Sequence, residues 1–170
     1  MLSLWLMPDK ETYFKLSQLI EDLSTVHHTP TFEPHVTLLS GIVDEDDIAL
    51  EKTKQLAEKT GLLGGSLTSI EYLEYYYRCL FFRTDDCEDI FDLRKEAEEL
   101  FEHTNVNPFI PHVSFLYGAL PVFKKEAIVA ELGDRYFMQF NMQRLRLVRT
   151  ELTPDHWKLV GEFELGTAEE

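Results

Sequence analysis

The sequence predicts an α+β fold, and three observations support this class. Strand-like segments outnumber the helices that could connect them. Strand-like segments also follow one another directly at 66–83 and at 136–164, as in antiparallel hairpins. An octapeptide at 32–39, FEPHVTLL, recurs at 109–116 as FIPHVSFL. Because 170 residues are enough for one core and too few for two, we expect a single domain, 1–170, with two lobes.

The first half of the chain predicts the order strand, helix, strand, helix. Residues 2–7 are apolar and form a strand candidate that Pro8 ends, and Asp9 is suited to cap the helix that follows. Apolar side chains recur on one face of this helix at Tyr13, Leu16, Leu19, Ile20 and Leu23. The first octapeptide then predicts a strand after its proline, and 44–60 predicts a second helix.

The second half predicts more strands than helices. Residues 66–83 are rich in β-branched and aromatic side chains, which predicts two strands. A third helix is expected to start at Asp85 or Asp86. The second octapeptide predicts another strand, 121–132 a short fourth helix, and the residues from Tyr136 onward two or three final strands. Neighbouring strands of this kind favour an antiparallel sheet over a doubly wound parallel one.

The charge of the chain limits the ligands that it can bind. With 31 acidic and 16 basic residues, the formal net charge is −15 at pH 7. Such a chain repels the backbone of long DNA or RNA and gains nothing from counterion release. A local cluster of donors can still hold a small ligand with one or a few phosphates. We therefore expect a small phosphate-bearing ligand and no long nucleic-acid partner.

Other features argue against a membrane, a metal and a nucleotide cofactor. No apolar run approaches the roughly 20 residues of a membrane span, and the first residues lack the basic start of a signal peptide. We therefore expect a soluble, cytoplasmic protein. Cys79 and Cys87 are too few for a disulfide framework and lack metal-ligand spacing, so we expect reduced thiols. A glycine-rich phosphate loop is also missing from the sequence.

The repeated octapeptide places a histidine and a hydroxyl residue two positions apart, twice. Side chains at i and i+2 of a strand point to the same face. His35 and Thr37 would therefore face one way while Val36 faces a core, and His112 and Ser114 would do the same in the second copy. If the repeat reflects a pseudo-twofold arrangement, two imidazoles and two hydroxyls converge across one groove.

This set of side chains suits a phosphodiester. With an ordinary pKa of about 6.5, one imidazole can accept a proton while the other donates one. The hydroxyls can donate hydrogen bonds to nonbridging phosphate oxygens. A purely structural repeat would explain the shared Phe, Pro, Val and Leu, but not two costly polar pairs. We therefore expect metal-independent hydrolysis, in which water attacks phosphorus and a sugar oxygen leaves.

The two octapeptides, together with the N-terminal LSLWLMP, resemble the cyclic phosphodiesterase branch of the two-histidine (2H) phosphoesterase superfamily. The resemblance implies that His35 and His112 are catalytic, that Thr37 and Ser114 hold the phosphate, and that Tyr117 lies in the same cleft. It also implies a bilobal, pseudo-twofold fold in which two antiparallel sheets line a central cleft and helices pack outside. We favour His112 as the base and His35 as the acid.

The resemblance also implies the substrates. That branch opens 2′,3′-cyclic nucleotides to nucleoside 2′-phosphates, and ADP-ribose 1″,2″-cyclic phosphate, a by-product of tRNA splicing in RNA metabolism, to ADP-ribose 1″-phosphate. The alternatives are a phosphodiesterase of 2′,5′-oligoadenylate or RNA ends, and a phosphate-binding module without turnover. We expect a monomer that needs no cofactor.

Three further features each have two interpretations. Trp5 could lie beside the ligand or in the core. The run YYYR at 75–78 could stack on a base and contact a phosphate, but we favour packing within a strand. Arg144 and Arg146 share a strand face and could form a positive patch, but we favour a solvated face that balances nearby acids.

Overall fold

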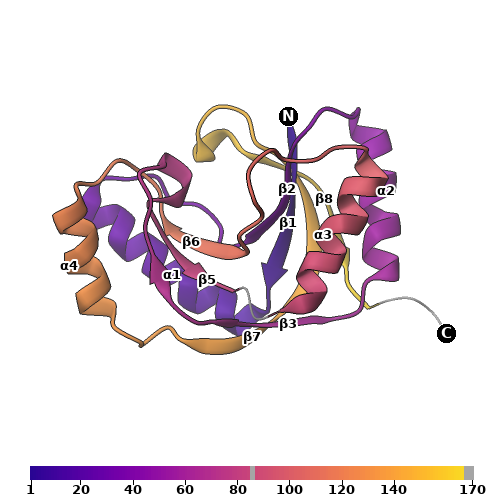
Figure 1. The fold of residues 1–170 in the computed structure, drawn as a ribbon. Helices are drawn as coiled ribbons and strands as arrows, with labels where there is room; N and C mark the ends of the chain where they lie inside the picture. Colours follow the sequence, from indigo (N-terminus) through magenta and orange to yellow (C-terminus); the bar gives the residue numbers. More distant parts are fainter. Residues whose placement is uncertain (85–86, 167–170) are drawn as a thin grey trace.

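The computed structural model describes residues 1–84 and 87–166 (Figure 1). Within these ranges the chain forms one curved antiparallel sheet with helices around it. The strands are β1 (Leu2–Pro8), β2 (Val36–Ile42), β3 (Leu63–Leu67), β4 (Ile70–Glu71), β5 (Leu80–Arg83), β6 (His112–Leu116), β7 (Met138–Arg149) and β8 (Lys158–Glu164). The helices are α1 (Lys10–His27), α2 (Asp46–Lys59), α3 (Glu88–Phe101) and α4 (Val122–Leu132), with short 3-10 helices η1 (Tyr76–Arg78) and η2 (Pro154–His156). No helix in these ranges is both long and apolar enough to cross a bilayer.

The strand order is β3-β7-β1-β2-β6-β5-β4, and β8 also pairs with β7. The long strand β7 pairs with β1 along one edge, and with β3 and then β8 along the other. This confirms the predicted α+β class with an antiparallel sheet. The two halves of the repeat lie on adjacent strands, β2 and β6, in the middle of the sheet.

The sheet has two halves: β3, β7, β1 and β2 together with β8 form one, and β6, β5 and β4 form the other. The junction between these halves is narrow. Strands β2 and β6 are paired through one residue pair, Val36 with Val113. The two sheets that the family resemblance implies are therefore joined into one sheet through this pair. In Figure 1, α1 and α4 lie on the side of β5 and β6, whereas α2 and α3 lie on the opposite side.

Each half covers the other. Helix α1 follows β1 in the chain but packs on β6, and α3 follows β5 but packs on β2. Helix α2 packs on β7 and β8. This crosswise packing buries the apolar face that the sequence predicts for α1, where Leu16, Leu19 and Ile20 are all buried. Asp9 caps α1 as expected and accepts a hydrogen bond of 3.0 Å from the backbone N–H of Thr12.

The prediction of two strands at 66–83 is partly wrong. Strand β3 ends at Leu67, β4 is two residues long, and η1 separates β4 from β5. The physical reason is the sheet order: β3 pairs with β7, whereas β5 pairs with β6 in the other half. The chain must therefore cross between halves in this segment and cannot stay extended. The expected helix start at Asp85 or Asp86 lies outside the described residues.

Candidate active site

The two octapeptides run antiparallel and meet at their valines. Val36 and Val113 are a register pair and are buried in the core. Extending an antiparallel register by one residue on each side places His35 across from Ser114, and Thr37 across from His112. Because side chains alternate along a strand, all four leave the sheet on the face opposite the valines. Side chains alternate along each strand, and the two strands pair at Val36 and Val113. The two copies of the repeat therefore form one site.

One cavity of about 280 Å³ contains both motifs. The side chains that the sequence predicts for the site all line it: His35, Thr37, His112, Ser114, Tyr117 and Trp5. The cavity is also lined by residues that the sequence analysis did not assign to the site: Ser3, Ser40, Tyr77, Arg78, Thr150 and Trp157. Most of these come from strand ends and 3-10 helices that only the folded sheet brings together.

The two histidines are held in the same way. The Nδ1 atom of His35 lies 2.6 Å from the backbone oxygen of Glu33, and Nδ1 of His112 lies 2.6 Å from that of Ile110. A carbonyl oxygen only accepts hydrogen bonds, so Nδ1 must carry the proton in each ring. The neutral imidazoles therefore both present an unprotonated Nε2, the atom that can act as a base or, once protonated, as an acid.

Burial controls the protonation of both rings. It lowers the pKa of His35 from 6.5 to about 4, with His112 and Arg146 adding to the shift and Glu33 opposing it. Burial likewise lowers the pKa of His112 to about 4, with Arg78 and Arg83 adding to the shift and the hydrogen bond to Ile110 opposing it. Both rings are therefore neutral near pH 7 in the free protein. Among the described residues, the Glu33 carboxylate opposes this shift at His35, and no carboxylate opposes it at His112.

The two hydroxyls differ in their partners. The Ser114 hydroxyl donates a 2.9 Å hydrogen bond to the backbone oxygen of Tyr77. The Thr37 hydroxyl forms no hydrogen bond with any other residue that the structure describes. Thr37 can therefore donate to a ligand directly, whereas Ser114 must exchange the Tyr77 carbonyl for the ligand.

Aromatic rings form the walls of the cavity. The indole of Trp5 stacks on the His35 imidazole with centroids 3.6 Å apart and is 3% exposed, so it is a core residue that also lines the cavity. Its contact with a ligand stays a prediction. Tyr117 stacks on Phe32, also at 3.6 Å. Burial raises the pKa of Tyr117 above its ordinary value, so its hydroxyl stays neutral. Trp157 packs edge-on against Trp5.

The preference for strand packing at 75–78 is wrong. Tyr76, Tyr77 and Arg78 form η1, and the last two line the cavity. The interpretation of Arg144 and Arg146 as a face that balances acids agrees with the structure. Both arginines pair with Glu162, and Arg146 also pairs with Glu33.

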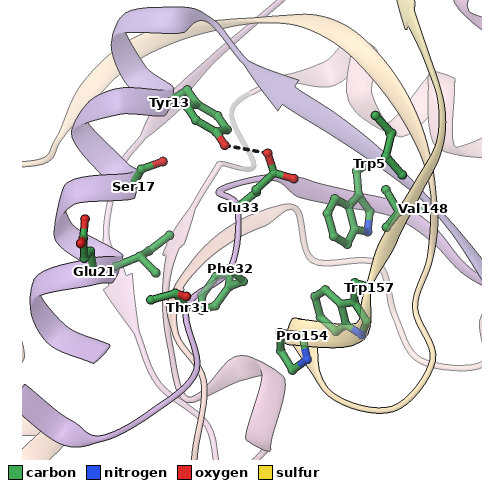
Figure 2. A pocket seen from close by; sticks show the side chains of 12 residues that line it. Trp5, Tyr13, Ser17, Glu21, Thr31, Phe32, Glu33, Val148, Pro154 and Trp157 are labelled. Atoms are coloured by element: carbon green, nitrogen blue, oxygen red, sulfur yellow. Dashed lines mark hydrogen bonds between the residues drawn. The ribbon is translucent and has the colours of Figure 1, made fainter. Parts of the chain in front are cut away.

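A second hollow of about 410 Å³ lies next to the cavity and shares Trp5 and Trp157 with it (Figure 2). Its wall includes Glu33, whose carboxylate accepts a 2.6 Å hydrogen bond from the Tyr13 hydroxyl. Arg146 donates to both Glu33 carboxylate oxygens at 2.9 Å. Tyr13 and Arg146 therefore hold the Glu33 carboxylate in place. The backbone oxygen of the same residue accepts the hydrogen bond that orients the His35 imidazole.

Metal ligands do not gather in the described part of the chain. Within residues 1–84 and 87–166, no group of three or more His, Cys, Asp or Glu side chains is placed to hold a metal ion. Cys79 and Cys87 are both buried.

Comparisons with known proteins show the family of this chain and its fold. The family model for cyclic phosphodiesterase-like proteins matches residues 1–169. A cyclic phosphodiesterase from Arabidopsis thaliana is 21% identical, over 96% of this chain and 94% of its own length. The crystal structure of TT0787 from Thermus thermophilus superimposes with a TM-score of 0.65 and 17% identity, covering 96% of this chain and 97% of that one.

Escherichia coli LigT, crystallised with 3′-AMP, superimposes with a TM-score of 0.59 and 12% identity, covering 98% of each chain. At these identities the structural matches show a common fold, while the family model covers nearly the whole chain. The resemblance to the 2H phosphoesterases, and to phosphodiesterases within them, is thereby confirmed. This chain belongs to the cyclic phosphodiesterase-like protein family.

Proposed function

We propose that this protein hydrolyses 2′,3′-cyclic nucleotides to nucleoside 2′-phosphates by acid–base catalysis with two histidines and no metal. The observation that supports this most directly is the shared cavity, which two imidazoles and two hydroxyls line. In each imidazole, Nδ1 is hydrogen-bonded to a backbone oxygen. The names of the relatives also support it: one is a cyclic phosphodiesterase, and the LigT crystal holds a nucleoside monophosphate.

In the proposed mechanism His112 is the base. Its neutral Nε2 removes a proton from a water molecule as the water oxygen bonds to phosphorus. His35, protonated at Nε2, gives that proton to the 3′ oxygen as the bond between phosphorus and this oxygen breaks. The assignment follows the neighbouring charges: Arg78 and Arg83 disfavour a charged His112, whereas Glu33 favours a charged His35.

The bound substrate would raise the pKa of the imidazole that acts as the acid. In the free protein both rings have a pKa of about 4, so at pH 7 neither carries the proton that an acid must donate. A phosphodiester in the cavity carries a negative charge, which raises the pKa of a nearby imidazole. We therefore expect binding to protonate His35. Thr37, Ser114 and the Tyr117 hydroxyl would hold the phosphate, and Trp5 would flank the nucleoside.

ADP-ribose 1″,2″-cyclic phosphate is a second substrate of the same chemistry. It presents a five-membered cyclic phosphate on a ribose, so the same acid and base would open it to ADP-ribose 1″-phosphate. Activity on it would place the protein in the cytoplasmic processing of a tRNA-splicing by-product. The net charge of −15 favours such small ligands over long RNA.

The test is product analysis by phosphorus NMR with EDTA present. The four 2′,3′-cyclic nucleotides and ADP-ribose 1″,2″-cyclic phosphate should yield 2′-phosphates and the 1″-phosphate. His35→Ala and His112→Ala should each lower kcat on the order of 10² to 10⁴-fold without unfolding the protein. His27→Ala, at the far end of α1, should match the wild type. Cleavage of 2′,5′-oligoadenylate instead, or tight binding without any product, would contradict the proposal.

A further inference from the structure

One permanently charged side chain, Arg78, lies among the described residues that line the catalytic cavity. The histidines there are neutral near pH 7, and the other lining side chains are hydroxyl or aromatic groups. Arg78 is half-buried at the end of η1. Its guanidinium forms no hydrogen bond or ion pair with any residue that the structure describes.

This lack of a partner is unusual in so acidic a chain. Five other arginines form ion pairs with carboxylates: Arg83, Arg94, Arg144, Arg146 and Arg149. The sequence has 31 acidic residues, and a half-buried guanidinium that meets none of those that the structure describes and lines a cavity is suited to an anion from outside the protein.

The backbone of η1 is tied to the strand that carries the second motif. The Gly118 N–H donates a 2.9 Å hydrogen bond to the oxygen of Tyr76, and the Leu73 N–H donates one of 3.0 Å to the oxygen of Arg78 itself. These backbone bonds hold η1 in place when the Ser114 hydroxyl turns from the Tyr77 oxygen to a ligand. An anchored backbone limits how far the guanidinium can move, which is the preorganisation that charge stabilisation requires.

We propose that Arg78 binds a nonbridging oxygen of the substrate phosphate and stabilises the negative charge that grows there as water attacks. This inference rests on the proposed function, because it names a further phosphate-binding residue in the same site. A guanidinium keeps its charge throughout the working pH range and can donate two parallel hydrogen bonds to a phosphate. It supplies the attraction for an anion that two neutral imidazoles cannot.

An alternative role for Arg78 is to tune His112 through space. Arg83 provides the matched control, because it also lowers the pKa of His112 but pairs with Glu71 and does not line the cavity. Replacing either arginine with methionine should raise the pKa of His112 and shift the acidic limb of the kcat/KM profile to higher pH. Only the replacement at Arg78 should weaken phosphate binding.

The experiment measures Kd for inorganic phosphate by calorimetry, and kcat and KM for 2′,3′-cyclic AMP, in four proteins. These are the wild type, Arg78→Met, Arg78→Lys and Arg83→Met, each checked for an unchanged thermal unfolding curve. Arg78→Met should raise Kd for phosphate about 10- to 100-fold and lower kcat/KM by at least as much. Arg78→Lys should lose less phosphate affinity and less activity, because lysine keeps the positive charge but cannot donate two parallel hydrogen bonds. Arg83→Met should keep Kd within about threefold of the wild type.

Three outcomes would overturn the role of Arg78: phosphate binding that Arg78→Met leaves unchanged, an equal loss in Arg78→Met and Arg83→Met, or a wild type that binds no phosphate. A wild type that binds phosphate but turns over no cyclic phosphate would contradict the proposed function alone. In that case the comparison of Kd values still decides whether Arg78 binds the anion.

Discussion

At the scale of single residues, two backbone carbonyls determine the chemistry of the site. Each accepts a hydrogen bond from Nδ1 of the histidine two positions later, which leaves Nε2 as the reactive atom in both rings. The sequence shows the histidines, but it does not show this hydrogen bond, because the bond depends on the backbone conformation around each ring. Burial of the rings in the folded protein lowers their pKa.

These pKa values predict how stability depends on pH. In the unfolded chain the two histidines take up protons near pH 6.5, whereas in the folded protein they do so only near pH 4. Between these values the unfolded state binds more protons, so the free energy of unfolding should fall as the pH decreases from about 6.5 to about 4. Urea unfolding across this range measures it, and His35→Gln should flatten the slope. Histidine titrations by NMR with midpoints near 6.5 would contradict the prediction.

We expect Glu33 to act on the reaction through His35, as a positioning residue. Its carboxylate raises the pKa of His35, whereas Arg146 lowers it. Glu33→Gln should therefore lower the pKa of His35, so that the basic limb of the kcat profile moves to lower pH. Once this limb lies below pH 7, kcat at pH 7 should fall about tenfold for each further pH unit by which the limb moves. Glu162→Gln, which also removes a partner of Arg146, is the control and should leave the limb in place. Identical profiles for Glu33→Gln and the wild type would exclude this role.

At the scale of elements, α4 supports the segment that leads into η1. Lys125 is 1% exposed, and its Nζ donates a 2.8 Å hydrogen bond to the backbone oxygen of Leu73. It also pairs with the Glu74 carboxylate at 3.4 Å. The amphipathic pattern of 121–132 predicts the helix, but a buried lysine within it is explained only by the carbonyl that it meets in the folded protein.

Lys125→Met should show the strength of this support. Removing the donor leaves the Leu73 carbonyl buried without its partner, which should cost about 1–3 kcal/mol of the free energy of unfolding in urea. Phosphate affinity should also fall, because η1 loses an anchor upstream of Arg78. The neighbouring exposed Lys124 offers a control, since Lys124→Met should change stability by no more than about 0.5 kcal/mol. Equal effects from both lysines would show that α4 does not hold the segment.

At the scale of the whole molecule, the two halves of the sheet meet at one residue pair. Val36 and Val113 each follow a catalytic histidine of the proposed mechanism and are 1% and 0% exposed. The packing of this pair therefore sets the separation of the two imidazoles. Crosswise packing of α1 and α3 holds the halves together around it.

Val36→Ala should weaken catalysis more than its stability cost suggests. The cavity should lower the free energy of unfolding by about 2 kcal/mol, as for other buried truncations. In addition, kcat should fall by more than about tenfold, because small displacements of acid and base are costly. Ile90→Val, at a buried position on α3 away from the junction, should lower stability by about 1 kcal/mol and leave kcat unchanged. A similar kcat in both variants would show that the junction does not set the geometry.

The sequence by itself determined the α+β class, the order of helices and strands, and the two octapeptides that supply the imidazoles and hydroxyls. These features depend on residues two to four positions apart, whose mutual placement follows from strand alternation and helical period. Only the tertiary structure decided that 76–78 forms a 3-10 helix beside the second motif, and that Arg78 and Trp157 line the cavity. The physical reason is that these contacts join segments far apart in the chain, and their placement depends on how the whole sheet curves around the single pair between β2 and β6.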